Sequence, residues 1–314
     1  AYPYHDTPDG EKRIYLIGEF MDPLRLQTLS DAVQGMGILY AVTGEEAYAH
    51  RVAAILCDFA EAVPHWPKVA RGIHSGLEGA DRFLPTDDYR DYSGIWYDKY
   101  HSGIGSIPAS LASGYDFVVK APMWAALDAR AEGGDARAAI EDDLFLYSAR
   151  DEIMYDVHYP RPSSAVSNYI PYQMTGLASI GRAVGIPELV HYMHWKGLQL
   201  VRKTLMADGM FPESVSYARQ HVYGIARATV IAEGYTDPPG FVSSIDGKRF
   251  KDLDILRDLP ELGRAIRVLE TLTYPDGESM MIHDTYGRLV SAGFPPPSET
   301  KPMIYPAFGH GVLG

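Results

Sequence analysis

The strongest constraint on the fold is a helical period that recurs in paired segments. In LRLQTLSDAVQGMGILYAVTG the apolar positions Leu26, Leu29, Val33, Met36 and Tyr40 recur every three or four residues, and the pattern stops at a Thr-Gly turn. Such spacing predicts an amphipathic helix. A second helical pattern, EEAYAHRVAAILCDFAEAV, follows at once and ends before Pro64. Two helices joined by so short a turn predict a helical hairpin.

The same unit returns in YQMTGLASIGRAVGIPELVHYMHWKGLQLVRKTLMADG, where Gly185 is expected to end one helix and Pro187 to open the next. Further helical patterns cover about 104–119, 136–156, 215–233 and 257–272. Little of the chain has a convincing strand pattern. The repeated hairpins therefore predict an all-α fold, an (α/α) toroid or an incomplete one, in which helix ends and loops form a cleft.

Three segments depart from the helical rhythm. Residues 64–94 and 158–168 are long connections rich in turn residues, which in compact domains are usually functional or disordered. After about Tyr274 the helical period is lost. We expect residues 1–290 to form the helical domain, and residues 291–314 to be a linker or the start of a β-rich domain that is mostly absent from this chain.

Composition excludes several classes of function. The chain has 28 Lys and Arg against 41 Asp and Glu, a net charge of −13, so a generic nucleic-acid binder is not expected. No apolar run approaches the roughly 20 residues of a membrane span. The single cysteine, Cys57, allows neither an intramolecular disulfide nor a cysteine-built zinc site. Because the sequence begins at Ala1 rather than Met, we expect that a leader or a preceding segment has been removed. We expect the protein to be periplasmic or secreted.

Three segments together resemble a known family. GILYAVTGEEAYAHRVAAILCDFAEAVP, SNYIPYQMTGLASIGRAVGIPELVHYMHWKGLQLV and DGMFPESVSYARQHVYGI occur in the order and spacing of the helical domain of heparinase II/III-like polysaccharide lyases, which include alginate lyases. The resemblance covers about residues 24–290 and includes YPDGESMMIHDT near its end. It implies an (α/α) toroid catalytic domain followed by an antiparallel β-sandwich, with an anionic uronate polysaccharide or oligosaccharide bound between them.

The chemistry of such an enzyme requires three roles. To cleave a 4-linked uronate by β-elimination, it must neutralise the carboxylate, remove the C5 proton and protonate the leaving O4 oxygen. An amide or a cation suits the first role, and a tyrosine or histidine suits the other two. Asn168, Tyr217 and His221 supply these types of side chain and are our candidate catalytic residues.

Asn168 lies just before a predicted helix, so it is either an N-cap or, as the resemblance implies, the residue that binds the substrate carboxylate. Many lyases of this family follow that asparagine with a histidine base. Here Tyr169 follows, which favours a mechanism in which one tyrosine makes both proton transfers. We include Tyr169 and Tyr172 among the candidate substrate-binding residues.

Tyr217 matches the tyrosine of the family pattern Asp-Gly…Glu-x-Ser-x-x-Tyr, here carried by Asp208, Gly209, Glu213, Ser214 and Tyr217. A phenol needs a lowered pKa to act as a base near neutrality, and Arg219, His221 or Arg227 are candidates to provide part of that effect. His221 lies one helical turn after Tyr217, although a packed histidine is an equal alternative. Glu213 either contacts substrate or shapes the turn.

Further candidates come from aromatic and histidine positions. The segment YSGIWYDKYHSGIG offers Trp96, Tyr97, Tyr100 and His101 as a sugar platform or as core residues. His283 corresponds to the turn with which the family's toroid closes near its cleft, and we include it among the candidate substrate-binding residues. His191 and His194 have i, i+3 spacing but no evident third ligand, so we predict no metal site. We expect no cofactor in this chain; any metal ligand from a β-rich domain would lie outside it.

Three functions remain open at this point. The first is an anionic polysaccharide lyase. The second is an (α/α) glycoside hydrolase, which needs two carboxylates across the glycosidic bond, with Asp98, Asp208, Glu213 and Asp284 as candidates. The third is a carbohydrate-binding helical domain without catalysis. The polymer, the endo or exo mode of action and the oligomeric state are open as well.

Overall fold

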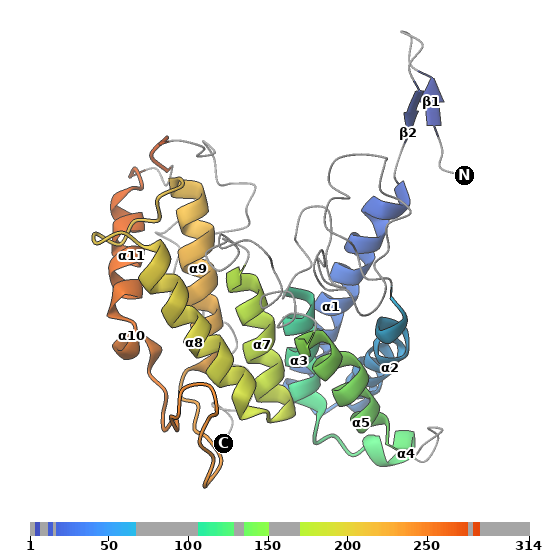
Figure 1. The fold of residues 1–314 in the computed structure, drawn as a ribbon. Helices are drawn as coiled ribbons and strands as arrows, with labels where there is room; N and C mark the ends of the chain where they lie inside the picture. The colour runs from blue at the N-terminus through green and yellow to red at the C-terminus, as the bar shows by residue number, and fades with distance from the viewer. Residues whose placement is uncertain are drawn as a thin grey trace.

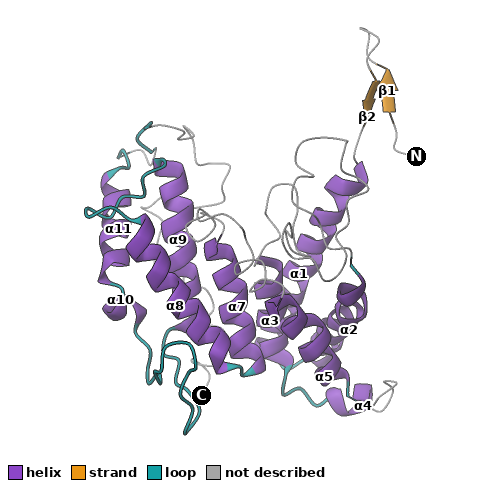
Figure 2. Ribbon diagram, in the orientation of Figure 1, coloured by secondary structure: helices purple, strands orange, loops and turns teal. Residues whose placement is uncertain are grey.

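The computed structural model describes residues 4–6, 12–14, 17–66, 106–128, 135–150, 170–275 and 279–282. This part of the chain is helical apart from a short antiparallel hairpin near the N-terminus, in which Tyr4 pairs with Ile14 and Asp6 with Lys12 (Figure 2). The all-α prediction is therefore confirmed for the described residues.

The elements follow one another in a simple order. They are β1 (Tyr4–Asp6), β2 (Lys12–Ile14), α1 (Ile17–Thr43), α2 (Glu46–Ala62), η1 (Val63–His65), α3 (Ser106–Val118), α4 (Trp124–Asp128), α5 (Ala136–Ala139), η4 (Ile140–Leu146), α7 (Ile170–Val184), α8 (Pro187–Thr204), α9 (Val215–Ala232), α10 (Ile255–Asp258) and α11 (Pro260–Thr271). Segment η4 is a π-helix, and α-helix continues after it to Arg150.

The expected turns lie where their residue types require them. Gly44 separates α1 from α2 with φ +72°, and Gly185 separates α7 from α8 with φ +77°, a region that glycine enters without steric cost. Pro187 is the first residue of α8, where its missing N–H costs nothing. These local rules made both hairpins readable from the sequence.

Two details of the helical pattern were wrong. The predicted helix 257–272 is two helices, because Pro260 opens α11 directly after buried Leu259. Proline cannot continue the hydrogen-bond ladder of α10, so the chain starts a new helix there. Leu29 was expected on the buried face of α1 but is 40% exposed, whereas Val33 on the same helix is fully buried.

Alternate helices form one row. Helix α1 contacts α3, α3 contacts α7, and α7 contacts α9. The intervening helices return against this row: α2 contacts α1, α8 contacts α7 and α9, and α11 contacts α9. Figure 1 shows the row running from α1 on one side of the molecule to α9 and α11 on the other.

Helix α7 joins two hydrophobic cores. Leu177 and Ile180 belong to a core built with α1, α2, α3 and η4, while Met174 and Ala178 belong to a core built with α8, α9 and α11. Almost every residue from Ile170 to Gly181 is buried. A helix that is apolar around most of its circumference must be covered on all sides, which explains its central place in the row.

We predict that the contact between α1 and α3 tolerates no side chain at Gly114. A Cβ at this position would lie 2.5 Å from Val33 Cγ1 and 2.6 Å from the Val33 carbonyl oxygen. Gly114→Ala should therefore lower the free energy of unfolding by about 1–3 kcal/mol in urea denaturation.

The matched control is Gly35→Ala in α1, where a Cβ would meet nothing within 4 Å. This variant should gain roughly 0.5–1 kcal/mol from helix propensity. Equal stability changes for the two variants would show that α1 and α3 do not approach as closely as described.

Candidate functional site

The turn that leads into α9 is shaped by the residues of the Asp-Gly…Ser pattern. Asp208 Oδ1 accepts a hydrogen bond of 2.9 Å from the backbone N–H two residues later. Gly209 has φ +98°, and a Cβ there would lie 2.9 Å from the backbone nitrogen of Ala265 in α11. Ser214 caps α9, since its Oγ accepts a 3.2 Å hydrogen bond from the Tyr217 N–H. Backbone geometry thus accounts for these three positions.

Tyr217 lies in the first turn of α9. Its ring is half-buried and packs against the core formed with α8 and α11, while Glu213 just before the helix is exposed. The cap fixes the backbone of this residue and the core fixes part of its ring. A phenol in such a position is held in place while part of it remains in contact with solvent.

Arg219 is buried in the second turn of α9, with 8% of its surface exposed. One of its Nη atoms donates a hydrogen bond to Thr273 Oγ1, just after α11, and its buried Nε has no hydrogen-bond partner among the described residues. Burial lowers the pKa of this guanidinium, and the nearby Tyr223 opposes that effect. Arg219 is therefore a largely desolvated guanidinium.

Two tyrosines lie beside arginines of α9. Burial raises the pKa of Tyr172 in α7, and Arg227 lowers it. Burial also raises the pKa of Tyr223, and Arg219 lowers it. The structure thus places Tyr172, a predicted substrate-binding residue, within electrostatic reach of Arg227, and Tyr223 within reach of Arg219.

His221 lies in the core. It is fully buried, its ring stacks on Phe211 at 4.5 Å between centroids, and its Nε2 lies 2.8 Å from Thr204 Oγ1. The Thr204 hydroxyl donates its only proton to the Leu200 carbonyl oxygen, so the Nε2 of His221 must be the donor in their contact. Burial lowers the pKa of His221 to about 4. This environment favours the packing alternative, and a part in proton transfer stays a prediction.

Several predicted site residues lie outside the described part of the chain: Asn168, Tyr169, Trp96, Tyr97, Tyr100, His101 and His283. Helix α7 begins at Ile170, two residues after Asn168. The roles predicted for these residues remain predictions.

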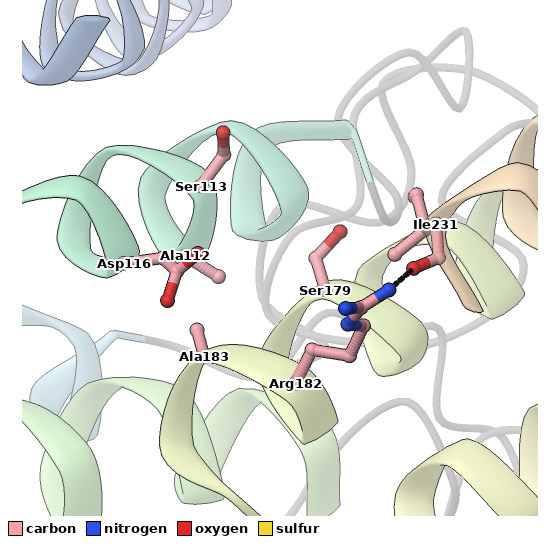
Figure 3. A pocket seen from close by; sticks show the side chains of 7 residues that line it. All are labelled: Ala112, Ser113, Asp116, Ser179, Arg182, Ala183 and Ile231. Carbon is pink, nitrogen blue, oxygen red and sulfur yellow. Dashed lines mark hydrogen bonds between the residues drawn. The ribbon is translucent and has the colours of Figure 1, made fainter. Parts of the chain in front are cut away.

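The C-terminal parts of α3, α7 and α9 meet at a structural junction. A small pocket there is lined by residues of three helices: Ala112, Ser113 and Asp116 of α3, Ser179, Arg182 and Ala183 of α7, and Ile231 of α9 (Figure 3). The Arg182 Nη1 donates to the carbonyl oxygens of Ile231 and Glu233, at 2.6 and 3.2 Å. It therefore satisfies carbonyl groups that the end of α9 leaves open.

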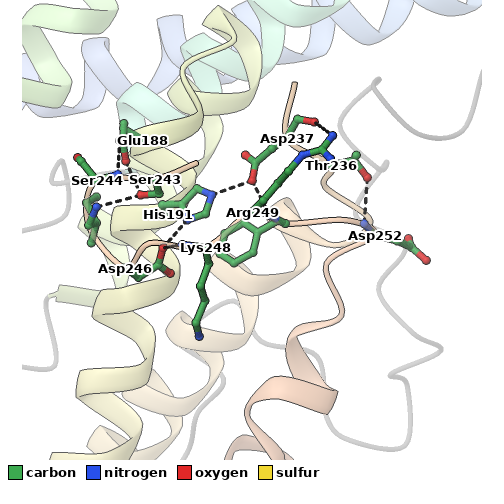
Figure 4. A network of polar contacts seen from close by, with 12 residues as sticks. Glu188, His191, Thr236, Asp237, Ser243, Ser244, Asp246, Lys248, Arg249 and Asp252 are labelled. Carbon is green, nitrogen blue, oxygen red and sulfur yellow. Dashed lines mark hydrogen bonds and ion pairs between the residues drawn. The ribbon is translucent and has the colours of Figure 1, made fainter. Parts of the chain in front are cut away.

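A polar network fastens the loop between α9 and α10 to α8 (Figure 4). His191 of α8 is fully buried, with Nε2 at 2.9 Å from Asp237 Oδ2 and Nδ1 at 3.2 Å from Asp246 Oδ1. Its ring stacks on Phe250 of the same loop, with centroids 3.8 Å apart. One turn earlier, Glu188 accepts a 2.6 Å hydrogen bond from Ser243.

The proton count of this network defines its chemistry. Ionised carboxylates only accept hydrogen bonds, so both ring nitrogens of His191 must donate if both contacts are hydrogen bonds. The cluster then holds one proton more than a neutral imidazole with two carboxylates. No group of three or more His, Cys, Asp or Glu suited to a metal ion occurs among the described residues. The prediction that this chain has no metal site therefore stays a prediction.

Sequence reasoning missed both the loop carboxylates and the hydroxyl beside Arg219. Asp237 and Asp246 lie in a 22-residue segment without helix, 233–254, whose length is itself a signal of a structured or functional loop. Thr273 pairs with Ser279 in an isolated antiparallel bridge, and no sequence pattern indicated that this bridge meets α9.

Comparison with known proteins leaves the family open. No protein-family model matches the chain, and no curated protein matches it. None of the helices in the described ranges is long and apolar enough to cross a membrane.

The burial of His221 predicts a pH-dependent loss of stability. Between about pH 6.5 and 4 the unfolded chain binds a proton at this residue and the folded chain does not, so the free energy of unfolding falls as the pH falls. The loss should reach about 3 kcal/mol. His221→Gln keeps an N–H donor for Thr204 without this titration, so urea denaturation at pH 7 and 4 should give a smaller loss for the variant. The same pH dependence in both proteins would contradict the burial of the ring.

The His191 network predicts strong energetic coupling. His191→Leu and Asp237→Asn should each lower the free energy of unfolding by about 3–5 kcal/mol, because each leaves a buried group without its partner. In the double variant, the free energy of unfolding should fall by clearly less than the sum of the two single losses. Urea denaturation of the four proteins tests this, and additive losses would show that the two side chains act independently.

Proposed function

We propose that the chain is the helical part of a polysaccharide lyase that cleaves an anionic, uronate-containing polysaccharide by β-elimination and leaves 4,5-unsaturated uronate ends. The observation that carries the proposal is a set of side chains on α9: a half-buried tyrosine at the helix start, followed along the helix by two arginines that each lie beside another phenol. In a chain of net charge −13, this is a local site for a negatively charged ligand.

The arrangement of the helices supports the same proposal. Alternate helices α1, α3, α7 and α9 lie in one row, with the return helices against it, as in one arc of an (α/α) toroid. A toroid that ends near residue 290, a following β-rich domain and a periplasmic or secreted location are part of the proposal.

The proposed reaction uses Tyr217 twice. As a phenolate, Tyr217 takes the C5 proton, the electron pair of that C–H bond forms the C4–C5 double bond, and the bond from C4 to O4 breaks. The phenol then returns its proton to O4, which leaves as a hydroxyl. Asn168 and Arg219 act on the carboxylate, because neutralising its charge makes the C5 proton more acidic. Returning the proton to O4 leaves Tyr217 as the phenolate with which the cycle began, so the enzyme is ready for the next turnover.

The hydrolase alternative has less support. Asp208 is committed to the turn before α9 through its contact with the Met210 N–H, and Glu213 is exposed. Asp98 and Asp284 lie outside the described residues. Hydrolysis and binding without catalysis are alternatives that differ from elimination in the products they give.

Tyr217→Phe should abolish β-elimination while keeping the fold. The ring and its packing remain, whereas the group that exchanges the proton is lost, so the rate should fall by about 10² or more. The measurement is the ultraviolet absorbance of the unsaturated uronate, on a panel that includes alginate and heparan-type chains.

Tyr40→Phe in α1 is the matched control, since it removes a partly buried phenol on another helix and should leave the rate unchanged. New reducing ends without absorbance would favour a hydrolase, and substrate binding without either product would favour a binding domain. Wild-type elimination by Tyr217→Phe on every polymer would refute the assignment.

A further inference from the structure

One side of helix α8 stays in contact with solvent. Most of the helix is buried, against α7, α9 and the loop that follows α9. Four residues that keep exposed surface recur at positions i, i+3, i+7 and i+10, which lie on one face of an α-helix. They are Tyr192, Trp195, Gln199 and Arg202. We call these four residues the outer stripe of α8.

The two rings of the outer stripe lie next to each other. The centroids of the Tyr192 and Trp195 rings are 5.8 Å apart, and the rings are inclined at 41°. Both residues are half-buried, and Tyr192 packs against the core formed with α1, α2, α3 and η4. Packing therefore holds the aromatic pair while part of each side chain remains accessible. Such side chains offer an apolar ring and a polar O–H or N–H, which suits a sugar ring with its C–H and hydroxyl groups.

The other end of the outer stripe is polar and positively charged. Half-buried Gln199 and exposed Arg202 continue the line of the rings toward the C-terminus of α8, and exposed Lys203 follows directly. An amide both donates and accepts hydrogen bonds, as sugar hydroxyls do, and a guanidinium binds a carboxylate through parallel N–H groups. The outer stripe thus offers surfaces for sugar rings at one end and for a carboxylate at the other.

The charged end of the outer stripe lies where α9 begins. Thr204, the last residue of α8, has its Oγ1 at 2.8 Å from Nε2 of His221, which is one helical turn after Tyr217. From Tyr192 to Arg202 the helix rises by about 15 Å, which is long enough for a short oligosaccharide. A chain bound along the outer stripe would therefore extend toward the end of the bundle that carries Tyr217.

The dimensions of the outer stripe favour a saccharide over a protein. A specific protein interface buries roughly 1,000 Å² or more around an apolar centre. The outer stripe is a single row of side chains without an aliphatic member, and the neighbouring Leu198 packs into the core with α9 and α11. A sugar chain is narrow and carries polar groups along its whole length, so it matches such a row.

We propose that the outer stripe of α8 is an accessory binding surface for the anionic polysaccharide, with sugar rings against Tyr192 and Trp195 and a carboxylate at Arg202. The inference rests on the proposed function and adds a second surface to it, which contains none of the residues assigned to the elimination. This surface holds a long polymer beside the end of the bundle at which α9 begins.

Affinity gel electrophoresis in gels that contain alginate or heparan-type chains tests the surface. All proteins carry Tyr217→Phe, so that the polymer is not consumed. Trp195→Leu removes the ring but keeps an apolar side chain for packing, and it should weaken binding about fivefold. Arg202→Gln should weaken binding about twofold to threefold at low salt, and this difference should disappear at high salt.

Arg264→Gln is the matched control, because it removes the same charge from an exposed side chain of α11 and should leave binding unchanged. Circular dichroism shows whether Trp195→Leu is folded. If it is not, Arg202→Gln decides, since its side chain is exposed and its loss leaves the core intact.

Kinetics with Tyr217 in place separate an accessory surface from the catalytic cleft. For a long polymer, Trp195→Leu should raise KM about fivefold and leave kcat unchanged. For a trisaccharide, both constants should be unchanged, because a short substrate bound at the catalytic cluster does not occupy the outer stripe. An equal rise of KM for both substrates would overturn the accessory role.

The remaining outcomes are also decisive. Equal retardation of all folded variants, or no retardation of the parent protein by any polymer of the panel, would overturn the surface and leave the lyase standing. Retardation that depends on Trp195, in a protein that produces no ultraviolet absorbance from any polymer, would refute the lyase and keep the surface. A wild-type dimer in gel filtration that becomes a monomer in Trp195→Leu would assign the outer stripe to a protein contact and overturn the proposal.

Discussion

The packing of α7 between α3 and α9 is the interaction on which the rest of the structure depends. This helix supplies apolar side chains to both cores, so neither core closes without it. Small residues set its distances: a Cβ at Gly224 of α9 would lie 2.6 Å from Pro171 Cβ, and one at Gly181 would lie 2.9 Å from Leu189 Cβ. Because α7 and α9 approach so closely at Pro171, the neighbouring Tyr172 comes within electrostatic reach of Arg227. The candidate site is thus a consequence of helix packing.

Helix α9 separates its structural and its chemical side chains by face and by position. Val215, Ala218, Val222 and Ile225 are fully buried at helical spacing. The polar residues on the other faces differ in their hydrogen-bond partners. His221 is neutral and hydrogen-bonded in the core, whereas the contact described for the Arg219 guanidinium is with a neutral hydroxyl. Within the described ranges, Arg182 and His191 each contact two acceptors, whereas Arg219 contacts one.

Local signals made most of the fold readable from sequence. Gly44, Gly185 and Pro187 act through their own backbone preferences, so the hairpin boundaries followed from residue type. Which helix would lie at the centre was not readable, because α7 and α8 have similar periodicity and differ in the neighbours that cover them. Within the site, Tyr217 was found through a family resemblance and Arg219 through its proximity in sequence. Thr273 and Asp237 were missed, because a bridge 54 residues away from Arg219 and a loop 46 residues beyond His191 depend on tertiary contacts.

The charge of the chain bears on how such a site would work. A net charge of −13 repels an anionic polymer at long range, so steering by the overall field does not help binding. At physiological ionic strength that repulsion is screened beyond about 8 Å, whereas a buried guanidinium is screened much less. Exposed acids such as Asp142 and Asp143 lie on η4, an element of the other hydrophobic core. If the proposed function holds, attraction at short range by a poorly hydrated cation such as Arg219 would decide the binding of an acidic ligand by this acidic protein.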